Sequence, residues 1–471
     1  MSSPSPDNSG DLFQRALALH QSGQLDQAGV LYRAVLVVQA DHADALHFSA
    51  LLAYQQGRHD EAIALFGQAL AVAPDVAFIH SNLGLAHAAA GHGDAAIASF
   101  VRAIDIDPTF AAAHFNLGAR LHAGGHYEEA RHHYEIALRL QPDYADARWN
   151  LADLALATGD WREGWAHYGA RFERPELAAA QAPWRADAAP EWDGVASLQG
   201  KSVLLYPEGG FGDLLMFARF VAPLAARGAQ VRLLVPRELT RILQGLAGVA
   251  EFVAFNGAGL VPPRCDFKLA LFSLPRVLGV TPANVPAAAY LKADAASVAR
   301  WRQRLGEIDP ARRFRIGINW AGRADNALEP QRGVPLTMLA GLAGQAEGRV
   351  QLVSMQKGPA AAQLAASSGI ADLGGEIADF ADSAALACAL DLVITSDTGL
   401  AHLLGALGLD AWVLLHRPCD WRWSGVAGMA GTPWYPGLRL FRQTVPGDWG
   451  TVLAAVAAAL PARIAAVCSQ N

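Results

Sequence analysis

One segment combines an acidic side chain with a glycine-rich turn. Glu208-Gly-Gly-Phe-Gly-Asp213 directly follows the β-rich run SVLLYP and directly precedes a helical stretch. Gly209, Gly210 and Gly212 permit positive φ and close backbone approach, and a helix N-terminus favours an anion. Asp213 could accept a proton from a hydroxyl there, or it could simply cap the helix. The spacing is not GxGxxG and no acidic ribose partner follows, which disfavours a nicotinamide site.

A second polar segment, Thr395-Ser-Asp-Thr-Gly-Leu-Ala-His402, follows the strand-like run LDLVI and opens another helix. Ser396, Asp397, Thr398 and Gly399 would place side-chain and backbone donors at the helix N-terminus, which suits an anion or a sugar hydroxyl. Ser396 or Thr398 could instead be an ordinary N-cap. His402 lies in the first turns of the helix, where a structural role competes with a role in binding.

Basic side chains follow two further strand-like runs. Asn319-Trp-Ala-Gly-Arg323 comes after RIGI, with Arg332 further along the same loop, and Lys357 comes after RVQLVSM. The fork of an arginine at a strand end can bind two oxygens of a diphosphate, although a loop arginine can equally be solvated.

Two aromatic segments follow the run DAWVLL. Asp420-Trp-Arg-Trp423 and Pro433-Trp-Tyr-Pro436 could stack on a base or a sugar, or could pack a long loop. We expect Trp434 and Tyr435 to pack.

These segments belong to a region in which short β-rich runs alternate with helical stretches. The alternation predicts βαβ units and parallel sheets. It is interrupted at residues 280–312, so two Rossmann-like halves, residues 200–295 and 310–467, are the simplest account. A ligand would bind where the carboxyl ends of both sheets face each other, and residues 449–467 should form a closing helix.

The first third of the chain repeats with a period of 34 residues. Five series of residues keep this interval. They are Gly23, Gly57, Gly91, Gly125 and Gly159; Pro74, Pro108 and Pro142; Ala28, Ala62, Ala96 and Ala130; Tyr32, Phe66, Phe100, Tyr134 and Tyr168; and Asn82, Asn116 and Asn150. In each repeat the glycine should end one helix with φ > 0, and the proline should end the repeat and start the next helix.

This pattern resembles the tetratricopeptide repeat over residues 9–172 and implies an α-solenoid with a concave groove. The groove could take a protein or peptide segment, or the array could serve as a spacer or dimerisation surface. Its histidines scatter over different repeat faces, which favours solvated or structural roles over metal binding. The pair Asp105 and Asp107 is interpreted as helix-end chemistry and not as a metal site. Residues 173–199 break the period and are interpreted as a linker, docked through Trp184 and Trp192.

Bulk composition excludes several classes of protein. The chain has 471 residues, of which 52% are hydrophobic, and a formal net charge of -7, which argues against a nucleic-acid partner. Its four cysteines lie far apart and predict neither a disulfide framework nor a zinc site. We expect no metal site. No secretory signal and no apolar run of membrane-spanning length are apparent, so a cytoplasmic protein is expected.

The α/β region is similar to GT-B glycosyltransferases, and most of all to the heptosyltransferase-type group known as glycosyltransferase family 9. The resemblance covers residues 200–465 and rests on Gly210-x-Gly-Asp213, on Ser396-Asp-Thr-Gly-x-x-His402 and on the two-half layout. It implies inverting, metal-independent transfer from a nucleotide-sugar co-substrate without another cofactor. Asp213 would be the base, Asp397, Thr398 and Gly399 would bind the donor, and Arg323 or Arg332 would bind its diphosphate.

The chain departs from that family in its repeat array and in the DWRW and PWYP segments, which leaves the sugar and the acceptor open. Tetratricopeptide repeats also precede GT-B domains in protein O-GlcNAc transferases, where the groove presents protein acceptors; this is an analogy of architecture alone. Two hypotheses follow: a glycosyltransferase with a repeat-recruited acceptor, or a scaffold protein whose GT-B unit does not catalyse.

Overall fold

The chain forms two compact units, Met1–Leu154 and Ala155–Asn471, in the computed structural model. The structure describes residues 9–175, 184, 189–256, 262–325, 328–345, 348–366, 369–424 and 431–468. Parts of the expected linker, residues 176–183 and 185–188, lie outside the described residues.

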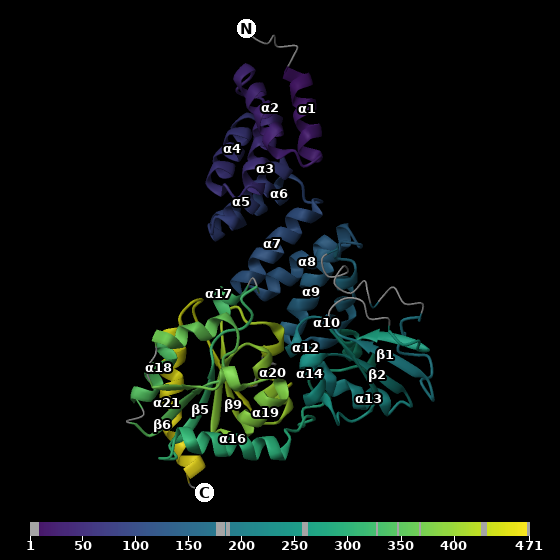
Figure 1. Cartoon of the computed structure of the whole chain (residues 1–471). Coiled ribbons are helices and arrows are strands. Elements are labelled where there is room, and N and C mark those ends of the chain that lie inside the picture. The colour runs from purple at the N-terminus through teal and green to yellow at the C-terminus, as the bar shows by residue number, and fades with distance from the viewer. Residues whose placement is uncertain are drawn as a thin grey trace. The chain divides into compact units, whose positions relative to one another are not determined.

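The first unit consists of α-helices that pair in chain order (Figure 1). The helices are α1 (Ser9–Gln21), α2 (Leu25–Val38), α3 (Ala43–Gln55), α4 (His59–Val72), α5 (Ala77–Ala89), α6 (Gly93–Ile106), α7 (Ala111–Gly124), α8 (Tyr127–Leu140) and α9 (Ala145–Thr158), the last of which continues into the second unit. The helical repeat array predicted from the 34-residue period is thus confirmed.

Glycines and aromatic rings of the repeat act as the period predicts. The five glycines that follow the first helix of each repeat have φ between 76° and 94°. Phe100 of α6 lies against Gly84 of α5 so closely that a Cβ on the glycine would overlap the ring, and Tyr134 lies in the same way against Gly118. Small residues therefore let paired helices approach, while the rings fill the space between them.

The prolines do not start helices as expected. Pro74 and Pro108 lie in turns, three residues before α5 and α7 begin at Ala77 and Ala111. Each ends the preceding helix, where a residue without an N–H is tolerated. Asp107 lies in the same kind of turn and accepts hydrogen bonds from the backbone N–H (2.9 Å) and the hydroxyl (2.7 Å) of Thr109. It thus has the helix-end role predicted for it.

His47 of α3 should make the stability of the chain pH-dependent. Its ring is only 4% exposed and packs among Phe66 and Phe78. Burial lowers its pKa to about 4, whereas in an unfolded chain it is about 6.5. The unfolded state therefore takes up a proton in this window that the folded state does not, and stability present above pH 6.5 is lost as the pH falls toward 4.

We expect the free energy of unfolding to fall by up to about 1.4 kcal/mol per pH unit from this histidine alone. Urea unfolding at pH 7 and pH 5 should show a smaller difference in His47→Leu than in the unmodified chain. His126, which is exposed, is the matched position. An equal reduction in His126→Leu would contradict the assignment.

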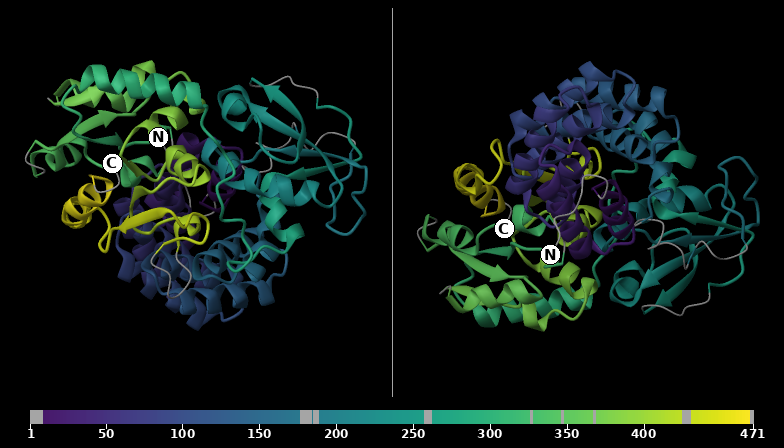
Figure 2. Two further views of the ribbon diagram at one scale, coloured as in Figure 1. Left: turned by 90° about the horizontal axis from the view of Figure 1, so that it is seen from below. Right: turned by 90° about the horizontal axis from the view of Figure 1, so that it is seen from above.

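The described residues of the second unit form two separate parallel sheets, which Figure 2 shows as a teal lobe and a green-to-yellow lobe. The first sheet has the order β3-β2-β1-β4. Its strands are β1 (Ser202–Tyr206), β2 (Gln230–Pro236), β3 (Val249–Phe255) and β4 (Phe267–Ala270). Its helices, in which η denotes a 3-10 helix, are α12 (Phe211–Phe217), η3 (Ala218–Phe220), α13 (Val221–Ala225), α14 (Arg237–Leu243), η4 (Leu271–Ser273) and α15 (Leu274–Leu278).

The second sheet has the order β10-β9-β8-β5-β6-β7, also parallel throughout. Its strands are β5 (Phe314–Asn319), β6 (Val350–Ser354), β7 (Ile370–Asp372), β8 (Leu392–Ser396), β9 (Ala411–Leu415) and β10 (Leu438–Arg442). The helices that follow these strands are α17 (Glu329–Arg332), α18 (Leu336–Gln345), η5 (Pro359–Ala366), η6 (Gly374–Glu376), α19 (Phe380–Ala389), α20 (Gly399–Ala406) and η7 (Trp421–Trp423). Strands β6, β8 and β9 are buried along their whole length, as expected for a parallel sheet covered on both faces.

Helix α16 (Ala295–Ile308) lies in the chain between the sheets, and α21 (Trp449–Cys468) follows the last strand. By length and composition α21 could cross a membrane, so the expectation that no apolar run reaches this length was wrong. Within the unit, Trp449, Val452, Leu453 and Val456 of α21 pack into the core of the second sheet. This packing explains why one face of α21 is apolar. The position of α21 agrees with the closing helix predicted for residues 449–467.

The compact units divide at a different residue from the boundary at 172 that the repeat pattern suggested. Helix α10 (Trp161–His167) and η2 (Tyr168–Phe172) belong to the second unit. Tyr168, the fifth member of the aromatic series, is buried against Phe272 and Trp421 of the α/β region. The 34-residue period thus continues in the sequence beyond the point at which the first unit ends.

Candidate functional site

Asp213 lies in the glycine turn (residues 208–213) between β1 and α12. Its Oδ2 accepts a hydrogen bond of 2.8 Å from the backbone N–H of Gly210, the N-cap of α12. Gly209 has φ 69°, and a Cβ there would overlap the Asp213 carboxylate. The capping role considered for Asp213 is therefore present. It engages one carboxylate oxygen and leaves the other directed elsewhere.

The other oxygen of Asp213 pairs with an arginine from the second half of the unit. Arg422 Nη2 lies 2.8 Å from Asp213 Oδ1, and Arg422 Nη1 lies 2.8 Å from Asp420 Oδ1. Burial alone would lower the pKa of the Arg422 guanidinium, but the two carboxylates outweigh it and raise the pKa well above its usual value. Arg422 therefore keeps its positive charge beside the candidate base.

Sequence reasoning did not single out Arg422. The DWRW segment drew attention for its aromatic rings, and both tryptophans are buried, as are Trp434 and Tyr435. The packing role predicted for Trp434 and Tyr435 is thus confirmed. The sequence does hold a signal for Arg422, because it lies between two tryptophans that favour burial. A buried cation needs anionic partners, so an ion pair could have been predicted there.

The second helix start (residues 396–402) lies at the carboxyl end of β8, beside the end of β5. Asn319 Oδ1 accepts hydrogen bonds of 3.2 Å from the hydroxyls of Thr395 and Thr398. Thr398 is the N-cap of α20, but its side chain makes no capping hydrogen bond. Ser396 Oγ is buried and has no hydrogen-bond partner among the described residues. This helix start therefore keeps polar groups that a ligand could satisfy.

Arg332 reaches this helix start. Its Nη2 lies 3.1 Å from Asp397 Oδ1, and it also donates to the Asp397 carbonyl oxygen. Asp397 is buried; desolvation raises the pKa of its carboxyl group, and the Arg332 cation opposes that shift. The Arg332 side chain is 19% exposed, so the residue is not fully enclosed.

His402 is enclosed by other side chains. Its Nδ1 lies 3.0 Å from the Tyr435 hydroxyl, and its ring stacks on Trp423 at 4.8 Å between centroids. Burial, together with Arg422, Arg219 and Arg332, holds the pKa of His402 well below its usual value. The imidazole is therefore neutral, and its environment matches the structural role weighed for it.

The glycine turn and the second helix start meet. A Cβ on Gly212 would lie 2.7 Å from His402 Cδ2 and 3.2 Å from Gly399 Cα, so only a glycine fits there without displacing its neighbours. Phe211 packs edge-on to Phe380 at 5.5 Å beside this contact. Two segments almost 200 residues apart in sequence thus form one region within the second unit.

Two predicted basic residues are engaged elsewhere. The Arg323 side chain is 76% exposed, and its Nε donates to Asp325 Oδ1 at 3.0 Å. The Lys357 side chain is exposed and donates to the carbonyl oxygen of Ile377. Gln356, its neighbour, accepts from the amide of Asn319 and from the backbone of Trp320, so Gln356 holds the loop after β5 in place. Of the basic residues considered, Arg332 has the geometry closest to the predicted role.

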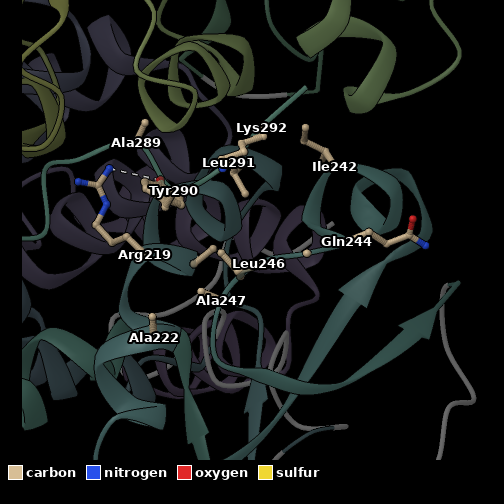
Figure 3. A pocket seen from close by; sticks show the side chains of 12 residues that line it. Arg219, Ala222, Ile242, Gln244, Leu246, Ala247, Ala289, Tyr290, Leu291 and Lys292 are labelled. Carbon is tan, nitrogen blue, oxygen red and sulfur yellow. Dashed lines mark hydrogen bonds between the residues drawn. The ribbon is translucent and has the colours of Figure 1, made fainter. Parts of the chain in front are cut away.

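A cavity of about 430 Å³ has a separate set of lining residues (Figure 3). Its lining includes Arg219, Leu246, Tyr290 and Lys292, and none of the residues predicted from sequence. The Arg219 guanidinium already donates to the carbonyl oxygens of Met216 (2.8 Å) and Trp434 (2.6 Å). The buried guanidinium of Arg219 in the cavity wall therefore already has hydrogen-bond acceptors within the protein.

Substitution of Gly209 should displace Asp213. Gly209→Ala would place a methyl group against the Asp213 carboxylate and 3.2 Å from Phe272 Cζ. Gly200→Ala is the matched control, because Gly200 has a similar φ of 72° and open space around the missing Cβ. Both changes carry the same left-handed backbone cost of about 1–2 kcal/mol. We expect Gly209→Ala to lower the free energy of unfolding by about 1–3 kcal/mol more, the usual cost of overpacking. An equal loss in the free energy of unfolding for the two variants, measured by chemical denaturation, would show that the turn accepts the methyl group without displacing Asp213.

Comparison with known proteins supports the tetratricopeptide repeats predicted for the N-terminal region. Family models described as tetratricopeptide repeat and TPR repeat match residues 13–77 and 49–109, and residues 118–159. The N-terminal region contains tetratricopeptide repeats. The curated Protein FlbA of Caulobacter vibrioides is 28% identical over 294 residues, which cover 57% of this chain and 48% of FlbA. This chain thus spans about half the length of that relative, and the alignment is longer than the repeat array alone.

Solved structures similar to the chain match over about a third of it. MamA is 21% identical, with 35% of this chain and 96% of that chain covered and a TM-score of 0.32. PilW, described as a widely conserved type IV pilus biogenesis factor, is 23% identical, with 38% and 85% covered and a TM-score of 0.34. YrrB, described as a TPR protein with an unusual peptide-binding site, is 19% identical, with 37% and 90% covered and a TM-score of 0.30.

Proposed function

We propose that the second unit is a GT-B glycosyltransferase that moves a sugar from a nucleotide-sugar donor to an acceptor hydroxyl, while the repeats recruit a protein acceptor or partner. The observation that carries the proposal is the contact of the glycine turn with the second helix start, which brings a carboxylate, two arginines and a helix N-terminus into one region.

The order of the strands supports this proposal. In chain order within its half, the second sheet has the order 3-2-1-4-5-6 of the doubly wound nucleotide-binding folds. Ligands of such sheets bind at the carboxyl ends of the strands where the order reverses, which is between β5 and β8. Asn319, Thr395 and Thr398 lie at that point. The first sheet reverses between β1 and β4, where β1 leads into the glycine turn.

The charges at these two points suit a diphosphate. Arg332 lies at the second helix start, and Arg422 lies between Asp213 and Asp420. The N-terminus of α20 adds backbone N–H groups and a favourable field for an anion. A diphosphate at this position would also offer an acceptor to the hydroxyl of Ser396, which has no hydrogen-bond partner within the part of the chain that the structure describes.

The mechanism that we propose is a single displacement. The acceptor oxygen forms a bond to the anomeric carbon, the bond from that carbon to the diphosphate oxygen breaks, and the hydroxyl proton passes to Asp213. The leaving diphosphate carries the negative charge, which Arg332 and the start of α20 stabilise. Asp213 Oδ1 is the oxygen that would take the proton, so Arg422 must turn from it toward the ligand.

A second candidate is a scaffold whose α/β unit does not catalyse. It is favoured by one observation, namely that both oxygens of Asp213 are already engaged, by Gly210 N–H and by Arg422. Under this hypothesis the tetratricopeptide repeats carry the function by binding proteins.

Calorimetric titration of the full chain with ADP, UDP, GDP and their common sugars, without added metal, tests the proposal. Saturable binding of one nucleotide, followed by transfer to an added acceptor, would support the transferase and name the donor class. Binding of none of them would favour the scaffold, whose function would then lie in the proteins that the repeats bind.

A further inference from the structure

The segment Trp161–Phe172, formed by α10 and η2, contacts both halves of the α/β unit. Trp161 stacks on Trp434 at 4.4 Å between ring centroids, and Trp165 packs edge-on to Trp421 at 5.4 Å. These partners belong to the second half. On the first half, Trp165 also packs edge-on to Phe217 at 6.2 Å. The segment is thus held by aromatic contacts on both sides of the region that contains Asp213.

Arg171, near the end of this segment, forms a two-pronged ion pair with Glu208. Its Nε lies 2.8 Å from Glu208 Oε1, and its Nη2 lies 3.0 Å from Glu208 Oε2. Nη2 also donates to Ser273 Oγ and Nη1 to the Tyr168 carbonyl oxygen, both at 2.8 Å. Glu208 Oε2 accepts a further bond of 3.1 Å from the backbone N–H of Phe272. Arg171 is 3% exposed, so the pair is fully enclosed.

This ion pair fixes the chain directly before Gly209. Glu208 is the first residue of the glycine turn. Gly210 lies two positions after it, and the N–H of Gly210 donates a hydrogen bond to the Asp213 carboxylate. The turn is therefore held at its start by Arg171 and at its end by the Asp213 carboxylate. A change in the position of Glu208 would shift the N–H that orients Asp213.

An arginine is required at this position by geometry. Its planar fork matches both oxygens of a carboxylate and still leaves N–H groups for Ser273 and Tyr168, whereas a lysine ammonium is a compact charge that cannot hold the same plane. Removal of the cation would leave the Glu208 carboxyl group buried without its partner, which destabilises the position that this residue holds at the start of the turn.

We propose that Arg171 is a positioning residue for Asp213, so that the segment Trp161–Phe172 is part of the transferase unit. The inference rests on the proposed function for its catalytic consequence, but the positioning of the turn does not. A fragment of the α/β region that begins after residue 172 would lack this support.

Hydrogen exchange in the full chain tests the positioning. In Arg171→Met, the peptide that spans residues 206–216 should exchange at least tenfold faster, because the hydrogen bond from Gly210 to Asp213 opens more often. Arg162→Met is the matched control, since Arg162 is an exposed residue of the same segment and should leave this peptide unchanged. Unchanged exchange in a folded Arg171→Met variant would overturn the proposal.

Two further measurements separate the possible outcomes. If Arg171→Met does not fold, Arg171→Lys keeps a cation beside Glu208 but loses the fork, and the same peptide should still exchange faster. Exchange equal to that of the unmodified chain would overturn the proposal. With a donor identified, either variant should lower kcat at least tenfold and leave the donor Kd within about twofold. Lack of turnover in the unmodified chain would contradict the proposed function, while the exchange result would still decide whether Arg171 positions the turn.

Discussion

Asp213→Asn is expected to lower kcat for sugar transfer by about 10²–10⁴-fold, the usual contribution of a general base, and to leave the donor Kd within about twofold. The amide oxygen of asparagine can still accept the hydrogen bond from Gly210 N–H, so the glycine turn should keep its conformation. The amide cannot take a proton from the acceptor hydroxyl. Steady-state kinetics with the identified donor, and calorimetry for its affinity, measure the two effects separately.

Asp420→Asn supplies the control for this experiment, because Asp420 is the other carboxylate that pairs with Arg422. If the loss in Asp213→Asn arose only from releasing Arg422, the two variants would lose similar activity. If Asp213 is the base, Asp420→Asn should retain most of the turnover. A turnover number for Asp213→Asn within about threefold of that of the unmodified chain would place the base elsewhere.

The sequence predicts those features of the fold that short segments determine. The 34-residue period reports helix pairs, because each repeat must present the same small residues and the same ring to its neighbours. Gly23 and Gly57 are required by a left-handed φ at the helix ends, which is a local property. Each β-rich run named from the sequence became a strand, since short β-rich runs bounded by turns can be recognised within a few residues of the chain.

The candidate site was only partly predictable, because it is formed by contacts between distant segments. Arg422 and Asp213 are 209 positions apart, and no periodicity or spacing links them. The buried pair of Arg171 and Glu208 likewise joins a residue that the repeat pattern assigned to the array with one in the first sheet's turn. Such pairs arise only once the chain has folded.

The choice between Arg323 and Arg332 shows the same limit within a single loop. Gly322 N–H donates to Glu329 Oε1 at 2.7 Å, and Val334 N–H donates to the Trp320 carbonyl oxygen at 2.9 Å. The loop after β5 therefore returns to the strand end from which it started. Arg332 is carried back to Asp397, whereas the Arg323 side chain points to solvent.

Arg332→Met is expected to weaken binding of the donor by about 10–150-fold, which corresponds to the loss of about 1.5–3 kcal/mol for hydrogen bonds to a charged group. Arg323→Met, from the same loop, should change the donor Kd by less than about threefold. Its exposed pair with Asp325 is screened by solvent and contributes little to stability. Calorimetric titration of both variants with the same nucleotide sugar measures the difference.

A weaker affinity in Arg332→Met has two possible causes, which a third variant separates. The change removes a cation that could contact the diphosphate, and it also leaves the buried Asp397 carboxylate without its partner, where it would repel an anion. In Arg332→Met/Asp397→Asn both charges are absent. If repulsion by Asp397 were the cause, this double variant would regain the affinity of the unmodified chain. If Arg332 binds the diphosphate directly, the double variant stays weak, and Arg332→Lys, which keeps a cation without the fork, should recover only part of the loss.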